Sequence, residues 1–526
     1  MNHPVDVAIL NAEIVDGSGG PSRMGDVACH DGRICFVGDF RGRATRTIDA
    51  YGMVLAPGFV DLHSHSDYSL LADPLARSKV YQGVTTEVGG NCGYHAAPIF
   101  GGVATEREAE YAASMALSAT WRTSSEYRAR LRHEAHSVNY AQQIGYNTLR
   151  SALTDDHARR LSVTERDALR RAVRAEFDEG AIGLSYGLTY VPACFSSIDE
   201  LIDVAHEAAS AKAFISFHMR DEGDFLLEAM EESFEIGRRS GAPVHLGHIK
   251  TFRRRNWHKI DDVLGHVRRE RAAGMDLTVD RYPHLAMNTQ FKFVLPQGAL
   301  EGGVSAMKAR LRDADVRARI VRELEATAGE EVKEILISLV SHPENKACEG
   351  KFLNELAQGH APWEVALSLL GTEGDAAFAT FFGMNQDNLD RILALDCAIV
   401  ASDASVQAVD KQAGGGRPHP RCFDTFPYFL AEWVYARRQL SLPEAIRKIT
   451  SLPSQRAGFV DRGLIGEGMH ADLALLEPAT LSASVSYESP VRYTRGVHTV
   501  LVNGVVVIDA GLHTGARPGA LLARAR

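Results

Sequence analysis

Two histidines separated by one residue, at the end of a largely apolar stretch, constrain the fold of this chain more than any other feature. Residues 53–60 lead through Asp61 to His63 and His65. Side chains two residues apart in a β-strand share a face, so both imidazoles would point the same way. Neutral imidazoles are common metal ligands, and two on one strand can hold one ion. The alternative is that both are surface histidines at the end of a strand. The residues at the ends of the other strands decide between these two interpretations.

Short apolar strands alternate with longer helical stretches over most of the 526 residues. Helices are expected at residues 162–179, 225–240 and 305–327. Strands are expected near residues 58–65, 85–92, 139–146, 180–186, 213–219, 243–249, 275–282 and 397–403. Eight such strands predict an α/β fold of the (β/α)8 TIM barrel type, with a doubly wound open sheet as the competing architecture. The barrel is preferred because polar residues follow many of the strands, where barrel active sites are built.

Further strands with glycine-containing turns occupy both ends of the chain. Residues 1–57 contain four short strands, at 7–10, 12–15, 25–29 and 33–38, and residues 466–526 contain a strand, an Asn-Gly turn and another strand. Such turns are typical of tight hairpins, and chain termini often lie close together. We therefore predict a small β-sandwich built from both chain termini, residues 1–57 and 466–526, beside a barrel of residues 58–465.

The connection between residues 282 and 397 is too long for a single loop. It predicts an insertion of about residues 288–345 that covers the mouth of the barrel. A glycine-rich segment, residues 410–416, follows the last barrel strand and is expected to be a mobile loop.

Composition excludes several classes of protein. The chain is 45% hydrophobic and 24% charged, as a globular protein with a sizeable core is. Its net charge of −10 and the lack of a basic stripe argue against nucleic acid as a partner. No apolar run is long enough to span a membrane, and residues 1–6 lack the start of a signal peptide. Seven scattered cysteines without a CxxC pair favour reduced thiols and a cytoplasmic location.

Several strand ends carry side chains that can bind a metal ion. They are His63, His65, Cys92, His218, His248 and Asp403. Each has an ordinary explanation when taken alone: a packed thiol, a histidine bonded to a backbone carbonyl, or an aspartate that caps a helix. Together they would place a thiolate, imidazoles and a carboxylate on one face of the barrel. Nitrogen and sulfur ligands of this kind point to zinc.

These motifs resemble those of the amidohydrolase superfamily, and within it the D-aminoacylases, the N-acyl-D-amino-acid deacylases. The resemblance covers essentially the whole chain and rests on residues 57–65, 82–86, 90–93, 183–190, 218–222, 247–250, 280–283, 402–403 and 417–421. Its most specific block is the Gly-Asn-Cys-Gly of residues 90–93. Most of the superfamily bridges two metals with a modified lysine on the fourth strand, whereas this subgroup uses a cysteine on the second. No lysine ends the strand near residues 180–186, in agreement with that pattern.

The resemblance implies a ligand set and a mechanism. Cys92, His218 and His248 would hold one tightly bound zinc ion. A second, weaker position would consist of His63, His65 and Asp403, which share Cys92. Asp403 would take a proton from the attacking water and pass it to the departing nitrogen, first as a base and then as an acid.

The resemblance also implies residues that contact the substrate. Tyr190 matches the family tyrosine that faces the scissile carbonyl, although a loop aromatic packed on the insertion is an equal alternative. Lys250, Tyr282 and Arg421 match positions that bind the substrate's α-carboxylate, and a guanidinium suits bidentate contact with a carboxylate. A solvated strand-end lysine is the alternative for Lys250.

The expected activity is zinc-dependent hydrolysis of N-acyl-D-amino acids to a carboxylate and a D-amino acid. Another amide, carbamoyl or cyclic amide substrate with a nearby carboxylate is the alternative. A barrel that has lost catalysis and serves as a binding protein is a third hypothesis, against which the six filled ligand positions weigh. The expected partner is a small molecule with a free carboxylate, with no nucleic acid and no membrane, and a homo-oligomer stays open. The segment between Asp403 and Arg421 is longer than the family pattern, which leaves the side-chain preference open.

Overall fold

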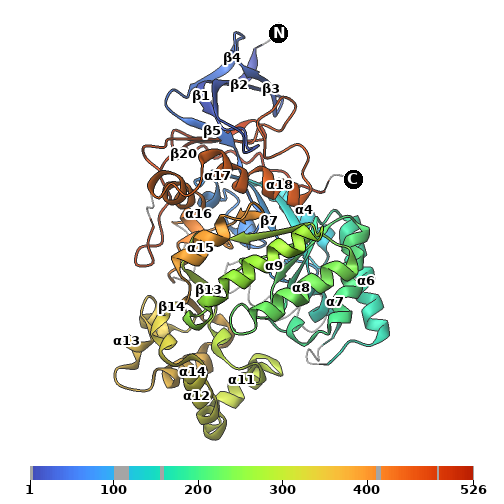
Figure 1. The fold of residues 1–526 in the computed structure, drawn as a ribbon, viewed down its shortest axis with the longest axis vertical. Coiled ribbons are helices and arrows are strands. Elements are labelled where there is room, and N and C mark those ends of the chain that lie inside the picture. Colours follow the sequence, from blue (N-terminus) through green and yellow to red (C-terminus); the bar gives the residue numbers. More distant parts are fainter. Residues whose placement is uncertain (1–3, 100–117, 155–158, 410–415, 482–484, 525–526) are drawn as a thin grey trace.

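The computed structural model describes residues 4–99, 118–154, 159–409, 416–481 and 485–524. The molecule has three parts, with the N-terminal strands at one end, a helical insertion at the opposite end and the barrel between them (Figure 1). The predicted mobile loop at residues 410–416 lies outside the described residues except for Gly416. Within the described residues no helix is long and apolar enough to cross a membrane.

The central part is a parallel sheet of eight strands. They are β6 (Phe59–Asp61), β7 (Val84–Gly89), β8 (Asn139–Gly145), β9 (Gly183–Gly187), β10 (Phe214–His218), β11 (Val244–Leu246), β12 (Leu277–Arg281) and β16 (Ala398–Val400). Just beyond β6 and β16 the two edges meet, because Asp403 N donates to His63 O at 2.8 Å and His65 N donates to Ala404 O at 3.2 Å. The near-closed sheet confirms the predicted barrel, and the open doubly wound sheet is wrong.

Helices cover the outside of this barrel. Those before β11 are α1 (Ser69–Ala72), α2 (Arg77–Val80), α4 (Ser124–Glu134), α5 (Tyr146–Leu153), α6 (Val163–Asp178), α7 (Ile198–Ser210) and α8 (Leu226–Ser240). Those after it are α9 (Ile260–Ala272), α15 (Gln386–Leu393), α16 (Arg421–Phe429), α17 (Leu442–Ile449) and α18 (Ser451–Ala457). The predicted helices at 162–179 and 225–240 are α6 and α8. A capping box of Ser162 and Glu165 begins α6, and the apolar face of α8 is buried against the barrel.

The insertion has its own sheet and its own apolar core. Antiparallel strands β13 (Ala286–Gln290), β15 (Phe378–Phe382) and β14 (Ile335–Leu339) pack with α10 (Gln297–Leu300), α11 (Gly303–Arg312), α12 (Ala314–Ala328), α13 (Leu353–Ala357) and α14 (Pro362–Glu373). The single helix expected at 305–327 is wrong. The chain breaks at Asp313, whose carboxylate accepts from the backbone N–H groups of Asp315 and Val316 and so caps a second helix. These elements span residues 286–382, more than the expected 288–345, because β15 pairs with both other strands.

Strands from both chain ends form one nine-stranded sheet. They are β1 (Val5–Ile14), β2 (Arg23–His30), β3 (Arg33–Gly38), β4 (Ala44–Asp49), β5 (Val54–Pro57), β17 (Leu473–Leu476), β18 (Val497–Val502), β19 (Val505–Asp509) and β20 (Leu512–His513). Antiparallel pairing of β5 with β17 joins the two ends, as predicted. The strands expected at 7–10 and 12–15 are one strand, β1, with an irregular register around Asn11 at φ 61°.

A buried ion pair joins this terminal sheet to the barrel. Arg462 donates to the Asp472 carboxylate, and both side chains are about 5% exposed or less. Asp472 also accepts from the Asn139 side chain of β8 at 3.1 Å and from Asn503 N at 2.7 Å. One carboxylate therefore links the hairpin turn between β18 and β19 to a barrel strand.

We expect the Asp472→Ala variant to unfold at a clearly lower temperature. The change leaves the Arg462 guanidinium buried without its partner, which costs about 3–5 kcal/mol. The matched control is Asp461→Ala, because Asp461 is 41% exposed and pairs with Arg33 at 3.5 Å. An exposed pair contributes about 1 kcal/mol or less. Thermal unfolding followed by circular dichroism measures both, and equal midpoints for the two variants would contradict this role of Asp472.

Candidate metal centre and active site

The candidate site lies just past the carboxyl ends of the barrel strands. Strand β6 ends at Asp61, so His63 and His65 follow the strand rather than belonging to it. Their shared direction is nevertheless as predicted, because an isolated parallel bridge between Ser64 and Ala404 keeps this backbone extended. The two imidazole centroids are 5.4 Å apart. Ser64 N also donates to Val88 O of β7 at 3.0 Å, so contacts with β7 and with the segment after β16 together orient the pair.

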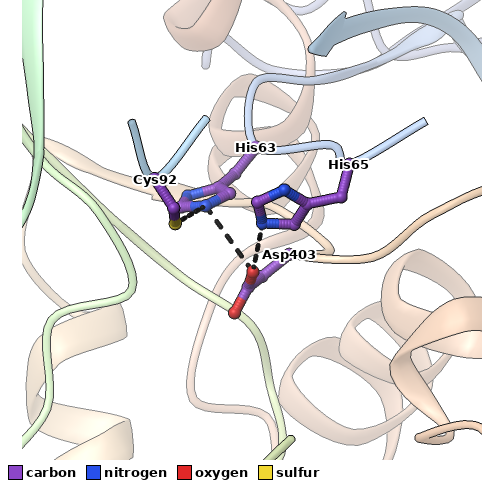
Figure 2. A group of neighbouring side chains, drawn as sticks. All are labelled: His63, His65, Cys92 and Asp403. Atoms are coloured by element: carbon purple, nitrogen blue, oxygen red, sulfur yellow. Dashed lines mark hydrogen bonds and ion pairs between the residues drawn. The ribbon is translucent and has the colours of Figure 1, made fainter. Parts of the chain in front are cut away.

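The six side chains singled out by the sequence come together here as two groups. The first holds His63, His65, Cys92 and Asp403, with one donor atom from each within 4.8 Å of all the others (Figure 2). In it, His63 Nε2 lies 3.3 Å from Cys92 Sγ, and His65 Nε2 lies 3.0 Å from Asp403 Oδ1. The second group contains Cys92, His218 and His248 within the same limit. Cys92 belongs to both groups.

The donor atoms fit a metal ion of the zinc type. A thiolate, imidazoles and one carboxylate are the ligands that zinc takes in proteins. His218 adds a structural observation, because its Nδ1 is buried and has no hydrogen-bond partner among the residues that the structure describes. A buried polar atom of this kind requires an explanation, and a nitrogen beside the Cys92 thiol is suited to bind a cation.

Mutual electrostatics keep the centre ionised. Burial alone would raise the pKa of the Cys92 thiol, but His63 and His248 beside it hold that pKa well below 9.0. Burial would likewise raise the pKa of Asp403, whereas Arg421 and His63 hold it well below its usual range. Both residues are therefore anions that can bind a cation.

The same anions act on the imidazoles. Burial lowers the pKa of His65, but the Asp403 hydrogen bond and the Cys92 thiol beside it raise that pKa to about 9. The pKa of His248 is raised to about 10, because Glu222 and Cys92 outweigh the effects of burial and of the Lys250 ammonium. Without a metal ion, protons on these imidazoles balance the buried negative charge.

Two buried carboxylates stand behind the histidines, and the sequence analysis gave them no role. Asp280 Oδ2 lies 2.8 Å from His63 Nδ1 and 2.7 Å from His245 Nε2. Glu222 Oε1 lies 2.8 Å from His248 Nδ1. Such carboxylate–histidine pairs fix the tautomer and orientation of metal ligands. The available signal for Asp280 was a carboxylate next to two apolar residues of β12, a strand that is buried throughout.

The residues expected to bind a substrate carboxylate are also buried beside the centre. Lys250 is 3% exposed, with Nζ at 2.5 Å from Glu222 Oε2 and 3.1 Å from His248 Nδ1, so it is not a solvated lysine. Arg421 Nη1 donates to Asp403 Oδ2 at 2.7 Å. Its guanidinium lies 4.6 Å from the centroid of the Tyr282 ring. Within the described part of the chain, the buried Tyr282 hydroxyl has no hydrogen-bond partner.

Tyr190 lies between the centre and the insertion. Its ring centroid is 4.7 Å from that of His218, and its hydroxyl is 3.2 Å from Thr289 Oγ1 on β13. Tyr190 therefore contacts both the candidate metal centre and the insertion, so neither of the two alternatives from the sequence is excluded. Burial raises the pKa of Tyr190 well above 10, which keeps the hydroxyl protonated and able to donate.

Three of the ligand candidates have a left-handed backbone. The φ angles of Cys92, His248 and Asp403 are 53°, 34° and 51°. Residues with a Cβ rarely adopt this region, and it persists where the surrounding structure fixes it. These three strand ends are therefore held in unfavourable conformations that aim their side chains inward.

Comparison with known proteins places this centre among hydrolases. The model of the Amidohydrolase family matches residues 46–358 and 402–508. An N-acyl-D-aspartate deacylase of Alcaligenes xylosoxydans xylosoxydans is 34% identical over 98% of this chain and 95% of its own length. An N-acyl-D-glutamate deacylase of the same organism is 30% identical over 100% of this chain and 98% of its own.

Solved structures agree over the same length. A D-aminoacylase with a binuclear metal centre matches with a TM-score of 0.83 and 30% identity, over 99% of this chain and 100% of its own. The N-acyl-D-glutamate deacylase of Bordetella bronchiseptica, complexed with zinc and a phosphonate mimic of the tetrahedral intermediate, matches with a TM-score of 0.82 and 29% identity, over 99% and 100%. A D-hydantoinase matches at 0.56 and 16% identity, which shows a shared fold only.

We expect Glu222→Gln to weaken zinc binding by about 10–100-fold, because the carboxylate that orients His248 is lost. Zinc affinity is measured by competition with a chromogenic chelator. The control is Glu232→Gln on α8, which makes the same change of charge at a partly buried ion pair with Arg220. Its zinc affinity should equal that of the unmodified chain. An unchanged affinity in Glu222→Gln would contradict the role of this carboxylate.

Proposed function

The chain belongs to the amidohydrolase family, and from this premise we propose that it hydrolyses N-acyl-D-amino acids in a zinc-dependent reaction. Its full-length relatives act, by their names, on N-acyl-D-aspartate and N-acyl-D-glutamate, which supports an amide substrate built on a D-amino acid. The observation that carries the proposal is the convergence of both donor groups on Cys92. The products would be a carboxylate and a free D-amino acid.

The proposed zinc ligands follow from the two donor groups. Cys92, His218 and His248 would hold one tightly bound ion, and the group of His63, His65 and Asp403 would offer a second, weaker position that shares Cys92. When bound, zinc supplies a Lewis acid for the carbonyl and lowers the pKa of water to about 7. The zinc and phosphonate complex of the Bordetella bronchiseptica relative supports zinc as the metal.

Asp403 is the proposed proton carrier. Its Oδ2 accepts from Arg421 at 2.7 Å, which leaves Oδ1 facing His65 at 3.0 Å and His63 at 3.6 Å. The carboxylate takes the proton of the attacking water and delivers it to the leaving nitrogen, so one residue serves as base and then as acid. Arg421 and the histidines keep it in the ionised form that the first step needs.

Three further side chains are proposed to bind the substrate's α-carboxylate. The Tyr282 hydroxyl, which none of the described residues bonds, can donate, and the guanidinium of Arg421 over its ring offers a bidentate contact. The Lys250 ammonium adds positive charge beside His248. Tyr190, on the His218 side of the centre, would donate to the scissile carbonyl oxygen. The carboxylate and the amide of one small substrate would then be fixed together.

The test of this function is hydrolysis of matched enantiomers. With zinc bound, we expect release of the free amino acid from at least one of N-acetyl-D-aspartate, N-acetyl-D-glutamate and N-acetyl-D-methionine. The corresponding L-enantiomer should react about 10²-fold more slowly, because fixing its carboxylate misplaces its amide. Equal turnover of both enantiomers, or turnover of neither, would contradict the proposal. Hydantoins and N-carbamoyl amino acids in the same panel measure the alternative substrates.

We expect Asp403→Asn to lower kcat by about 10²–10⁴-fold, because the proton transfers lose their carrier. Zinc held by Cys92, His218 and His248 should remain, as measured by elemental analysis of dialysed protein. The matched control is Asp390→Asn on the outer helix α15, where Asp390 pairs with Arg437; this variant should retain kcat. A fully active Asp403→Asn variant would refute the assigned role.

A further inference from the structure

A buried lysine lies close behind Asp403 without touching its side chain. Lys79, on the short helix α2, is 0% exposed. Its Nζ donates to Asp61 Oδ2 at 2.7 Å, to Ser402 Oγ at 2.9 Å and to Ala404 O at 2.8 Å. A carboxylate oxygen of Glu87 lies 3.4 Å away. The ammonium is therefore bonded to the residues before and after Asp403.

Asp61 holds the same stretch of backbone from the end of β6. Its Oδ1 accepts from Ser402 N at 2.9 Å, and its Oδ2 accepts from Ser402 Oγ at 2.5 Å. Ser402 Oγ in turn accepts from Ala404 N at 3.2 Å. Together with the bond from Asp403 N to His63 O, these contacts fix the backbone on both sides of Asp403.

This backbone needs to be fixed, because Asp403 has a φ of 51°. An aspartate without constraint leaves the left-handed region, and its carboxylate then points elsewhere. Residues 402 and 404 decide the orientation of the peptide planes that flank Asp403. The contacts of Lys79 and Asp61 therefore act on the direction of the Asp403 side chain.

Stability alone does not account for such an arrangement. A fully buried ion pair gains little over well-packed apolar residues of similar size, because both charges lose their hydration. The buried polar network instead defines one geometry. Here the network of Lys79 and Asp61 fixes the geometry of residues 402–404.

We propose that Lys79 is a positioning residue for the hydrolytic reaction, which together with Asp61 holds residues 402 and 404 so that the Asp403 carboxylate faces the metal centre. This inference rests on the proposed function of Asp403. Lys79 acts through the backbone and takes no part in the proton transfers.

The test compares two lysine–carboxylate pairs, one at each end of β16; both lysines are buried, whereas Asp61 is 0% exposed and Glu444 is 29% exposed. The variant K79M/D61N removes both charges at the carboxyl end of β16. The control K448M/E444Q removes Lys448, which is 1% exposed and donates to Leu395 O and Ala398 O at the other end of β16, together with its partner Glu444 at 3.3 Å. The experiment measures kcat, KM, zinc content and the thermal unfolding midpoint of both zinc-loaded proteins.

With the best N-acetyl-D-amino acid of the panel, we expect kcat of K79M/D61N to fall about 100-fold with little change in KM or zinc content. The control should retain kcat, although it also removes a buried lysine that bonds to the backbone beside β16. Equal losses of kcat in both variants would overturn the proposal. So would a loss of activity in K79M/D61N that parallels a loss of zinc, because the pair would then support metal binding instead.

Two further measurements keep the test decisive. If K79M/D61N does not fold, Ser402→Ala replaces it, since it removes the hydroxyl bonds to Lys79, Asp61 and Ala404 N without changing charge. A fall in its kcat at constant KM supports the proposal, and an unchanged kcat overturns it. If the unmodified chain hydrolyses no N-acyl-D-amino acid, the proposed function fails. A crystal structure of the variant then tests the inference, which is overturned if Asp403 keeps a left-handed φ and its direction.

Discussion

The structure depends on a buried thiolate at the end of β7. Cys92 Sγ is the atom common to both donor groups, and its position requires the residues around it. A Cβ at Gly90 would collide with the backbone carbonyl of Gln143, and one at Gly93 with the side chain of Asn147. The Asn91 amide donates to Leu62 O, Ser64 O and Val88 O, which ties the ends of β6 and β7 together. In this short motif the two glycines allow close packing, the asparagine joins the ends of the two strands, and the cysteine supplies the negative charge.

The positively charged side chains of the site already form ion pairs with its carboxylates. Lys250 pairs with Glu222, which orients His248, and Arg421 pairs with Asp403. A substrate carboxylate that approaches either cation therefore competes with a carboxylate of the protein. In the proposed reaction, binding of the substrate would be coupled through these pairs to the charge on the proton carrier. A neutral amide without an acid group lacks that coupling.

Sequence patterns predicted the barrel and the ligand candidates, but they did not predict the contacts that support these ligands. Parallel strands buried on both faces are short apolar runs, and the eight expected strands all correspond to strands of the sheet. The support of His63 by Asp280 joins residues 217 positions apart, which no local pattern encodes. The break at Asp313 was hidden because helical periodicity continues on both sides of it. The sequence predicts two strands in place of the irregular β1 for a similar reason, since polar Asn11 interrupts an apolar run without ending the strand.

The pairing of β5 with β17 has a consequence for synthesis of the chain. Leu55 lies opposite Leu475, so a strand made early is completed by one made more than four hundred residues later. Its backbone edge stays open on the ribosome until the last strands emerge, and β6, which begins two residues after β5, leads directly to His63. Contacts of such long sequence separation form slowly and leave apolar edges exposed to aggregation in the meantime. Completion of the terminal sheet therefore has to wait for the last part of the chain to be made.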